Sequence, residues 1–314
     1  MTPTDRPREP HALPDPDPTP VWLSMHLRCD NNTDEFLRGP VLQAIDELLE
    51  QDTARSWFYL RYWEGGPHIR LRILLPADRR ATAADLVQER ARLWLSEHDP
   101  GYPAAGDAYA RIAQSLAARE REDRELMPWQ PHGQTWEQAY VPEEAKYGTG
   151  ASLRAFEQHF RESSDLALRV LRQHPSTTQV LTLAVLLVLT GWGQDDIGPT
   201  VQSRGNLVER WSSPAALDRR APSRVRPDLL NGLLRRARAD DDPWCRDWRA
   251  SLQQLHRATS AAGFAAERWR NGADICHHLL CNRLGLTLEQ ELTVRRSAWS
   301  AMEAAAPAGS GLRS

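Results

Sequence analysis

The chain lacks the short signatures of several common protein classes. Its four cysteines, Cys29, Cys245, Cys276 and Cys281, form no Cys-x-x-Cys pair. This spacing predicts no disulfide framework and is typical of a protein from a reducing compartment. The chain also has no Gly-x-Gly-x-x-Gly segment, P-loop, His-Glu-x-x-His or Gly-x-Ser-x-Gly. Their absence argues against nucleotide-dependent and serine-hydrolase chemistry.

Long apolar segments are absent as well. The longest apolar run, Val180 to Leu189, is too short to span a bilayer and predicts a buried helix. Residues 1–20 contain seven prolines and no apolar segment of the kind found in signal peptides. We therefore expect a disordered stretch at 1–20, a second one at 305–314, and a soluble cytoplasmic protein without membrane contact.

Lysine is nearly absent. Lys146 is the only lysine among 39 lysine and arginine residues, and the formal net charge is −3. This balance makes no global case for direct binding to nucleic acid. The arginine-rich stretches 119–124 and 235–238 fall on predicted helices, where we expect solvent-exposed faces.

Hydrophobic periodicity predicts an α+β fold. Residues 21–28 resemble a strand, a helix is expected from about Pro40, and two aromatic or β-branched runs on either side of residues 64–67 predict a β-hairpin. A further strand is expected at 135–141. We expect a single domain over 21–304, with an antiparallel sheet and its N-terminal hairpin packed against a predominantly helical C-terminal half. The expected helices cover 81–97, 104–125, 152–173, 180–189, 226–239, 243–262, 269–284 and 287–304.

The hairpin carries the first candidate site. Alternate residues of a strand share a face, so His68, Arg70 and Arg72 point the same way. A turn centred on the two glycines would place Arg61 opposite Arg70 and Tyr59 opposite Arg72. Three guanidinium groups and an imidazole on one face favour an anionic partner, because like charges opposed across strands are destabilising. A solvent face with acidic neighbours and a carboxylate-binding surface both fit this pattern.

The segment DICHHLLCNRLG is the second candidate. On a helix, His278 and Asn282 share a face, as do His277 and Cys281. A histidine in a cleft is the usual general acid or base near neutral pH, although a lone helix histidine is more often structural. A zinc site here lacks a second ligand pair at a recognisable spacing, so we expect no metal.

The third candidate is YVPEEAKYGTG, residues 140–150. Glu143, Glu144 and Lys146 precede a glycine-containing turn and the start of a helix near Ser152. Backbone N–H groups at such a junction can bind an anion. A simple capped turn explains the same pattern.

Taken in the order of the chain, the three segments resemble the C-terminal domain of lantibiotic dehydratases and its stand-alone thiopeptide relatives. The matching stretches are WFYLRYWEGGPHIRLR at 57–72, YVPEEAKYGTGASLRAFEQHFRESS at 140–164 and HLLCNR at 278–283. The resemblance spans about residues 21–290. It departs from the family's pattern at Lys146, where the family has arginine.

The resemblance implies an enzyme that eliminates glutamate from glutamylated Ser or Thr of a ribosomally made precursor peptide. The products would be dehydroalanine or dehydrobutyrine. By the same resemblance, Arg70, Arg72 and Lys146 would hold the glutamyl carboxylate and ester, and His278 would be the general acid or base. The substrate-binding residues expected around them are Arg61, His68, Tyr147, Asn282 and Arg283.

Two other functions remain open for this fold. Thiopeptide pyridine synthases, which are similar, join two dehydroalanines by a formal [4+2] cycloaddition and expel water and the leader peptide. A non-catalytic subunit would instead bind a leader peptide by adding a strand to its sheet. The presence of Arg70, Arg72 and His278 favours elimination. The expected partners are the leader and core of the precursor peptide and a separate protein that transfers glutamate from glutamyl-tRNA; no cofactor is implied.

Overall fold

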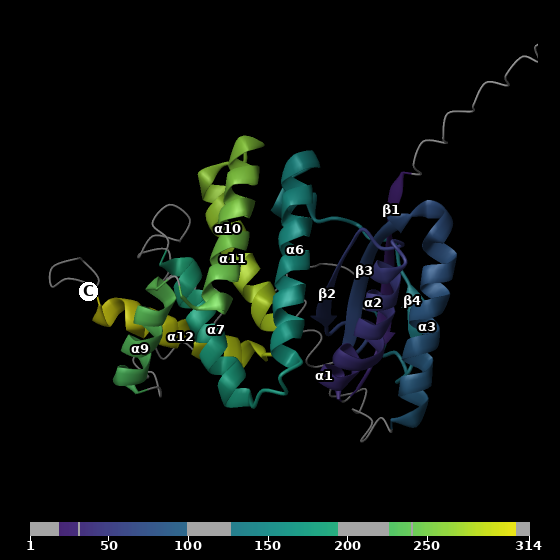
Figure 1. Ribbon diagram of the computed structural model, residues 1–314, viewed down its shortest axis with the longest axis horizontal. Helices are drawn as coiled ribbons and strands as arrows, with labels where there is room; N and C mark the ends of the chain where they lie inside the picture. The colour runs from purple at the N-terminus through teal and green to yellow at the C-terminus, as the bar shows by residue number, and fades with distance from the viewer. Residues whose placement is uncertain (1–18, 31, 99–126, 194–225, 240, 306–314) are drawn as a thin grey trace, which may run out of the picture.

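The computed structural model describes residues 19–30, 32–98, 127–193, 226–239 and 241–305. All described strands lie within residues 20–137, and only helices follow them among the described residues, which confirms the expected α+β class (Figure 1). The elements are β1 (Pro20–Arg28), α1 (Thr33–Phe36), the π-helix η1 (Leu37–Val41), α2 (Leu42–Glu50), β2 (Ser56–Tyr62), β3 (His68–Pro76), the 3-10 helix η2 (Ala77–Arg79), α3 (Arg80–Glu97), β4 (Thr135–Glu137), α5 (Glu144–Tyr147), α6 (Gly150–Leu171), α7 (Thr177–Trp192), α9 (Pro227–Arg238), α10 (Pro243–Ala261), α11 (Ala266–Arg283) and α12 (Leu288–Ala304).

Several expectations fall outside these ranges or differ from them. The expected helix 104–125, the arginine-rich stretch 119–124 and nearly all of both terminal stretches lie outside the described residues. The helix expected from Pro40 begins earlier, at Thr33, because the chain continues through a kink at Gly39. The strand expected at 135–141 ends at Glu137, after which the chain leaves the sheet.

The described strands form one antiparallel sheet in the order β2-β3-β1-β4. The central strands β1 and β3 pair along their whole lengths, and β2 pairs with the other side of β3. The short strand β4 pairs with β1 from Met25 to Leu27. The hairpin connection and both long strands therefore lie where the sequence pattern predicted them.

The predicted pairing of Arg61 with Arg70 is wrong, because Leu60 lies opposite Arg70. Residues 63–67 connect the two strands, so the pairing is centred on Gly65 rather than between the two glycines. Relative to the predicted pairing, the five-residue connection shifts the register of β2 by one residue. Such a shift moves each side chain of the strand to the other face of the sheet. Arg61 therefore lies on the opposite face of the sheet from Arg70.

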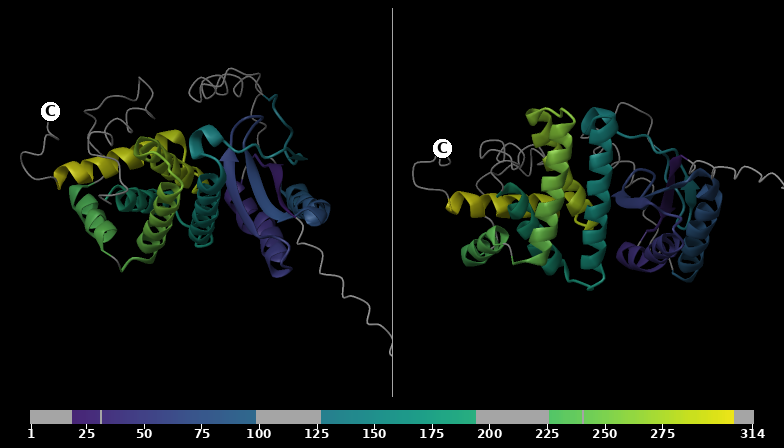
Figure 2. Two further views of the ribbon diagram at one scale, coloured as in Figure 1. Left: turned by 90° about the horizontal axis from the view of Figure 1, so that it is seen from above. Right: turned by 45° about the horizontal axis from the view of Figure 1, so that its top comes forward.

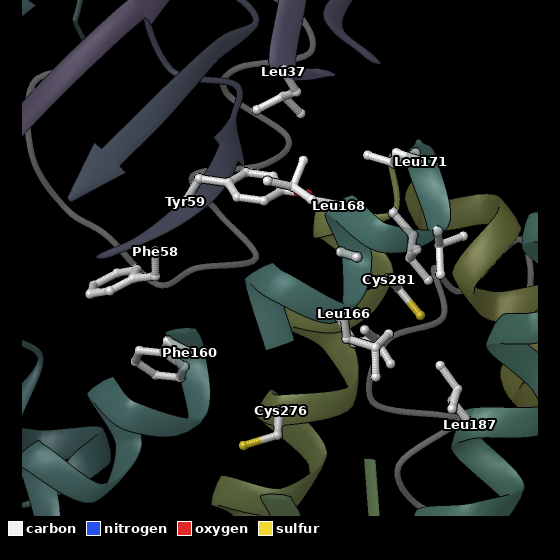
Figure 3. Packing of buried hydrophobic residues seen from close by; sticks show 14 of the residues in the cluster. Leu37, Phe58, Tyr59, Phe160, Leu166, Leu168, Leu171, Leu187, Cys276 and Cys281 are labelled. Carbon is white, nitrogen blue, oxygen red and sulfur yellow. The ribbon is translucent and has the colours of Figure 1, made fainter. Parts of the chain in front are cut away.

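The predicted pairing of Tyr59 with Arg72 is wrong for the same reason. Phe58 lies opposite Arg72, and its ring packs against Phe160 at 5.5 Å between centroids. Figure 3 shows Phe58 and Tyr59 pointing to opposite sides of β2, with Tyr59 turned towards Leu168.

The hairpin turn is held by a close approach of one arginine. Gly66 has φ +99°, and a Cβ there would come within 2.8 Å of the Arg28 guanidinium. Arg28 is fully buried and donates to the carbonyl oxygens of Pro67 at 2.5 Å and Gln130 at 3.1 Å. Its guanidinium also lies 4.4 Å from the ring centroid of Trp129. Arg28 thus joins the turn to the segment that precedes β4.

The two faces of the sheet have different coverings. The apolar face lies against α2 and α3 (Figures 1 and 2). Its fully buried side chains include Leu23, Met25, Leu27, Ile69, Leu71 and Ile73. We name the opposite side the arginine face. Its residues are Ser24, His26, Arg28, Phe58, Leu60, Tyr62, His68, Arg70, Arg72 and Trp136.

The helix α6 stands between the sheet and the remaining helices (Figure 1). It packs on β2 on one side and on α10 on the other. Both α7 and α12 begin with a capping box, in which Ser176 and Thr287 bond reciprocally with the glutamine three residues later. No helix in the described ranges has the length and apolar character needed to span a bilayer.

Candidate functional site

The structure brings His68, Arg70 and Arg72 together on the arginine face. The guanidinium of Arg70 lies 3.2 Å from the ring centroid of Tyr62 and 4.0 Å from the carboxylate of Glu64. The guanidinium of Arg72 lies 5.5 Å from the ring centroid of Tyr140. The arginine face thus holds two guanidinium groups against aromatic rings, and the buried carboxylate of Glu64 lies beside the guanidinium of Arg70.

Arg72 is the more deeply buried of these two cations, at 9% exposure. Its Nε and Nη1 atoms have no hydrogen-bond partner among the described residues. Burial, followed by the charge of Arg70, lowers the pKa of Arg72 to about 10. The side chain therefore stays charged at neutral pH, and unbonded N–H groups on a buried cation cost free energy. An anion bound here would remove this cost.

Two histidines lie beside the arginines. His26 pairs with Arg70 across β1 and β3, and its Nδ1 lies 3.1 Å from Nε2 of His68. Burial is the main cause that lowers the pKa of His26 to about 2 and that of His68 to about 4. Arg70 and Arg72 lower both values further. Both imidazoles are therefore neutral at neutral pH.

His26 was not among the predicted site residues. The signal was present in β1, where Trp22, Ser24, His26 and Arg28 alternate with leucine, methionine and valine. This alternation places His26 on the polar face of the sheet. Only the pairing of β1 with β3 brings it beside Arg70.

Tyr140 and Glu157 border the arginine face towards α6. Tyr140 packs edge-on against Trp22 at 5.5 Å and Phe58 at 6.0 Å between centroids. Its hydroxyl bonds to Glu157, and burial is the main cause that raises the pKa of both groups. This pair and Arg72 place a cation, a phenol and a carboxyl group in one neighbourhood.

Arg61 and Asn282 lie in a second group, at the outer edge of β2. The amide of Asn282 accepts from the Arg61 backbone N–H at 2.9 Å and donates to its carbonyl oxygen at 2.8 Å. One residue further on, Nε of Arg283 donates to the Tyr59 carbonyl oxygen at 3.1 Å. The Tyr59 N–H donates to Ser164 Oγ at 3.2 Å. Side chains of α6 and α11 thus complete the hydrogen bonding of this edge.

His278 lies on the side of α11 that faces α12. Its Nδ1 is 2.7 Å from Oε2 of Glu291, whose Oε1 accepts from Nε of Arg295 at 2.8 Å. Arg295 also pairs with the buried Asp274. Burial alone would raise the pKa of Glu291, but its bond to His278 and the charges of His278 and Arg295 lower it.

The ionised Glu291 can only accept, so Nδ1 of His278 carries the hydrogen of this bond. The His278 side chain is 22% exposed. This is the arrangement of an acid–base histidine oriented by a carboxylate. The spacing of Glu291 and Arg295 on a predicted helix was the only sequence signal for this network.

Lys146 and Tyr147 occupy α5, near the surface and the core respectively. Lys146 pairs with Glu143, and its side chain is 53% exposed. Tyr147 is 5% exposed and packs against Phe156 at 4.9 Å and Phe160 at 5.1 Å between centroids. The predicted site residues thus lie in separate groups: on the arginine face, at the β2 edge, between α11 and α12, and on α5.

Within the described ranges, no group of three or more His, Cys, Asp or Glu side chains is placed to hold a metal ion. All four cysteines are buried free thiols. Burial raises the pKa of Cys276 and Cys281, so neither is an activated nucleophile.

The family model of the lantibiotic biosynthesis dehydratase C-terminal region matches residues 22–302. A comparison with curated proteins gave no match. Among solved structures, the pyridine synthase TbtD from thiomuracin biosynthesis has a TM-score of 0.72 at 20% identity, covering 90% of this chain and 98% of its own. TsrL has a TM-score of 0.64 at 18% identity, covering 91% and 95%.

A third solved structure is the tRNA-dependent lantibiotic dehydratase MibB from Microbispora sp. 107891. It has a TM-score of 0.57 at 20% identity, and the match covers 95% of this chain but 28% of MibB. At these identities the three structures are similar to this chain in fold.

Proposed function

Because the chain belongs to the family of lantibiotic dehydratase C-terminal domains, we propose that it eliminates glutamate from glutamylated Ser or Thr residues of a precursor peptide. The family and its structural relatives act in the maturation of ribosomally made peptides. In the proposed step, a base removes the α-proton, the Cβ–O bond breaks, and glutamate leaves as its carboxylate. A Cα=Cβ double bond remains in the peptide.

The observation that carries this proposal is the buried Arg72 beside Arg70. The Nε and Nη1 atoms of Arg72 have no hydrogen-bond partner among the described residues, and a carboxylate matches the geometry of a guanidinium. Fixed cations aimed at an oxygen that gains charge lower the barrier to reaction, and losing one such contact typically costs about 10²–10³ in rate. The glutamyl group supplies a carboxylate for the guanidinium groups and an ester oxygen that gains negative charge as the Cβ–O bond breaks.

We assign His278 the role of general base and acid, because Glu291 orients its ring through Nδ1 and its side chain is 22% exposed. Lys146 is proposed to meet the substrate from the surface, since its ion pair with Glu143 is half exposed and therefore weak. For Asn282 and Arg283 we propose a positioning role, in which they hold the edge of β2.

The proposed partners are the leader and core of the precursor peptide and a separate protein that attaches glutamate from glutamyl-tRNA. The second proposal draws on the likeness in fold to the tRNA-dependent dehydratase, of which this chain covers 28%.

A second candidate function is pyridine formation by cycloaddition of two dehydroalanines. It is favoured by the likeness to a pyridine synthase over nearly the whole length of both chains. Binding of a leader by strand addition at β2 is disfavoured, since Asn282 and Arg283 already occupy the hydrogen-bonding groups of that edge.

Mass spectrometry of two peptides in parallel separates the two reactions. One peptide carries a glutamyl ester on serine, and the other carries two dehydroalanines. We expect the wild-type protein to convert the ester to dehydroalanine with release of glutamate, and Arg72→Met and His278→Ala to lose this activity. The matched control is Arg79→Met, which removes an arginine that is 62% exposed. An unchanged ester together with a pyridine macrocycle from the second peptide would refute elimination.

A further inference from the structure

Four side chains on the arginine face have buried polar atoms that form no hydrogen bond with any described residue. The atoms are Ser24 Oγ, His26 Nε2, Nε and Nη1 of Arg72, and Trp136 Nε1. The strand register makes these residues neighbours, since Ser24 lies opposite Arg72 and His26 lies opposite Trp136. Buried polar groups are nearly always bonded in folded proteins. A cluster of unbonded ones therefore marks a place where a ligand group or a bound water completes the hydrogen bonding.

The hydrogen positions in this cluster follow from one backbone carbonyl. Nδ1 of His68 lies 2.9 Å from the Gly66 oxygen, which can only accept, so Nδ1 carries the hydrogen. In a neutral His68, Nε2 is then an acceptor, and the hydrogen of the His26–His68 bond belongs to Nδ1 of His26. In a neutral His26, Nε2 is left as a lone pair.

The cluster thus offers donors and one acceptor to a ligand. The N–H groups of Arg72 and Trp136 donate, the lone pair of His26 accepts, and the Ser24 hydroxyl does either. His26 is 1% exposed, and its ring lies tilted against Trp136 at 5.0 Å and stacked on His68 at 5.0 Å between ring centroids, so the acceptor has a fixed direction. The charge of Arg72 disfavours a cationic group at this place, so the matching donor is a neutral one, such as the N–H of a peptide amide.

We infer that Ser24, His26, Arg72 and Trp136 form a subsite for a ligand group with oxygen acceptors beside one neutral N–H donor. In a peptide substrate, this group is the backbone amide of the acylated residue, with its N–H on His26 and the acyl oxygens on Arg72 and Trp136. The identity of the ligand rests on the proposed function, whereas the donor and acceptor pattern rests on the hydrogen bonds. His26 would then select for an unmodified amide at the reacting residue.

The first test is nitrogen-15 NMR of the histidine rings in the wild-type protein without ligand. We expect both His26 and His68 to carry their hydrogen on Nδ1 at neutral pH. Assignments come from the single variants His26→Gln and His68→Gln. A hydrogen on Nε2 of His26 would overturn the inference, because the subsite would then lack an acceptor.

The second test measures the affinity of a non-reacting probe. The probe is a peptide in which 2,3-diaminopropionate replaces serine and carries the glutamyl group through an amide. A second probe adds a methyl group to the backbone nitrogen of that residue. We expect methylation to weaken binding to wild-type protein about tenfold, as for one lost hydrogen bond. His26→Leu should weaken binding of the first probe similarly, and His26→Gln, which keeps an acceptor, should restore part of it.

Equal binding of both probes by wild-type protein would overturn the subsite. Elimination from the ester peptide is measured separately, so the two proposals can fail independently. Elimination without discrimination against the methylated probe refutes the subsite alone. Discrimination by a protein that leaves the ester unchanged supports the subsite and refutes the reaction. His278→Ala is expected to bind the first probe as wild type does while losing elimination.

Discussion

A substitution of Asn282 tests whether this predicted site residue stabilises the edge of β2 or contacts the substrate. Its amide makes two hydrogen bonds to the backbone of Arg61, at 2.9 and 2.8 Å. Asn282→Ala removes both partners and leaves one N–H and one carbonyl group of the β2 edge for water. Each such bond contributes about 0.5–1.5 kcal/mol net, so we expect a loss of about 1–3 kcal/mol in the free energy of unfolding.

The assay is urea unfolding followed by far-ultraviolet circular dichroism. The midpoint should fall while the slope stays unchanged, because the same surface is exposed on unfolding. Asn282→Asp is the matched control, since it keeps the acceptor for the Arg61 N–H and loses only the donor. It should cost less than Asn282→Ala. An alanine variant of unchanged stability with a raised KM for the peptide would refute the reasoning and make Asn282 a substrate contact.

Further predictions concern stability and the proposed chemistry. Arg72→Met should abolish elimination while leaving the free energy of unfolding unchanged or up to about 1 kcal/mol higher, because a buried cation with unbonded N–H groups is replaced by an apolar chain; a clear loss of stability in urea would contradict this. Glu291→Gln should lower kcat more than it raises KM, since the hydrogen bond that orients His278 loses its charged acceptor. Equal kcat values for the variant and the wild type would show that Glu291 does not contribute by orienting His278. Gly191→Ala should lower the free energy of unfolding by about 1–3 kcal/mol, because the new methyl group would lie 2.2 Å from Nε2 of the buried His277. Gly232→Ala on α9 places its methyl group within 4 Å of nothing and should raise the free energy of unfolding by up to about 1 kcal/mol. Similar urea midpoints for the two variants would contradict the packing around Gly191. The two histidines of the arginine face have pKa values lowered to about 2 and about 4, so they stay neutral in the folded protein and take up protons below pH 6.5 only in the unfolded chain. The free energy of unfolding should therefore fall from pH 6.5 towards pH 4, by up to about 1.4 kcal/mol per pH unit for each histidine. A free energy of unfolding that does not change over this pH range would contradict their burial.

The sequence pattern predicted the hairpin, both central strands and the longer described helices, because these depend on local periodicity. It predicted neither the short helices α1 and α5 nor the register. Whether Arg61 or Leu60 faces Arg70 depends on whether residues 63–67 form an odd or an even connection, and aromatic runs carry no information on that parity. A one-residue difference was enough to move Arg61 to the other face of the sheet.

The candidate site was predicted only in part for a related reason. His68, Arg70 and Arg72 share a strand, so alternation alone placed them together. His26 joins them through pairing between β1 and β3, and Glu291 meets His278 through packing of α11 on α12. Contacts between distant segments arise from the tertiary fold, which neither spacing nor composition encodes.

A crystal structure with the amide-linked glutamyl probe would show whether the arginine face holds the glutamyl group. We expect the probe's free carboxylate to lie against the guanidinium groups of Arg70 and Arg72. A glutamyl group bound away from both arginines would contradict this expectation.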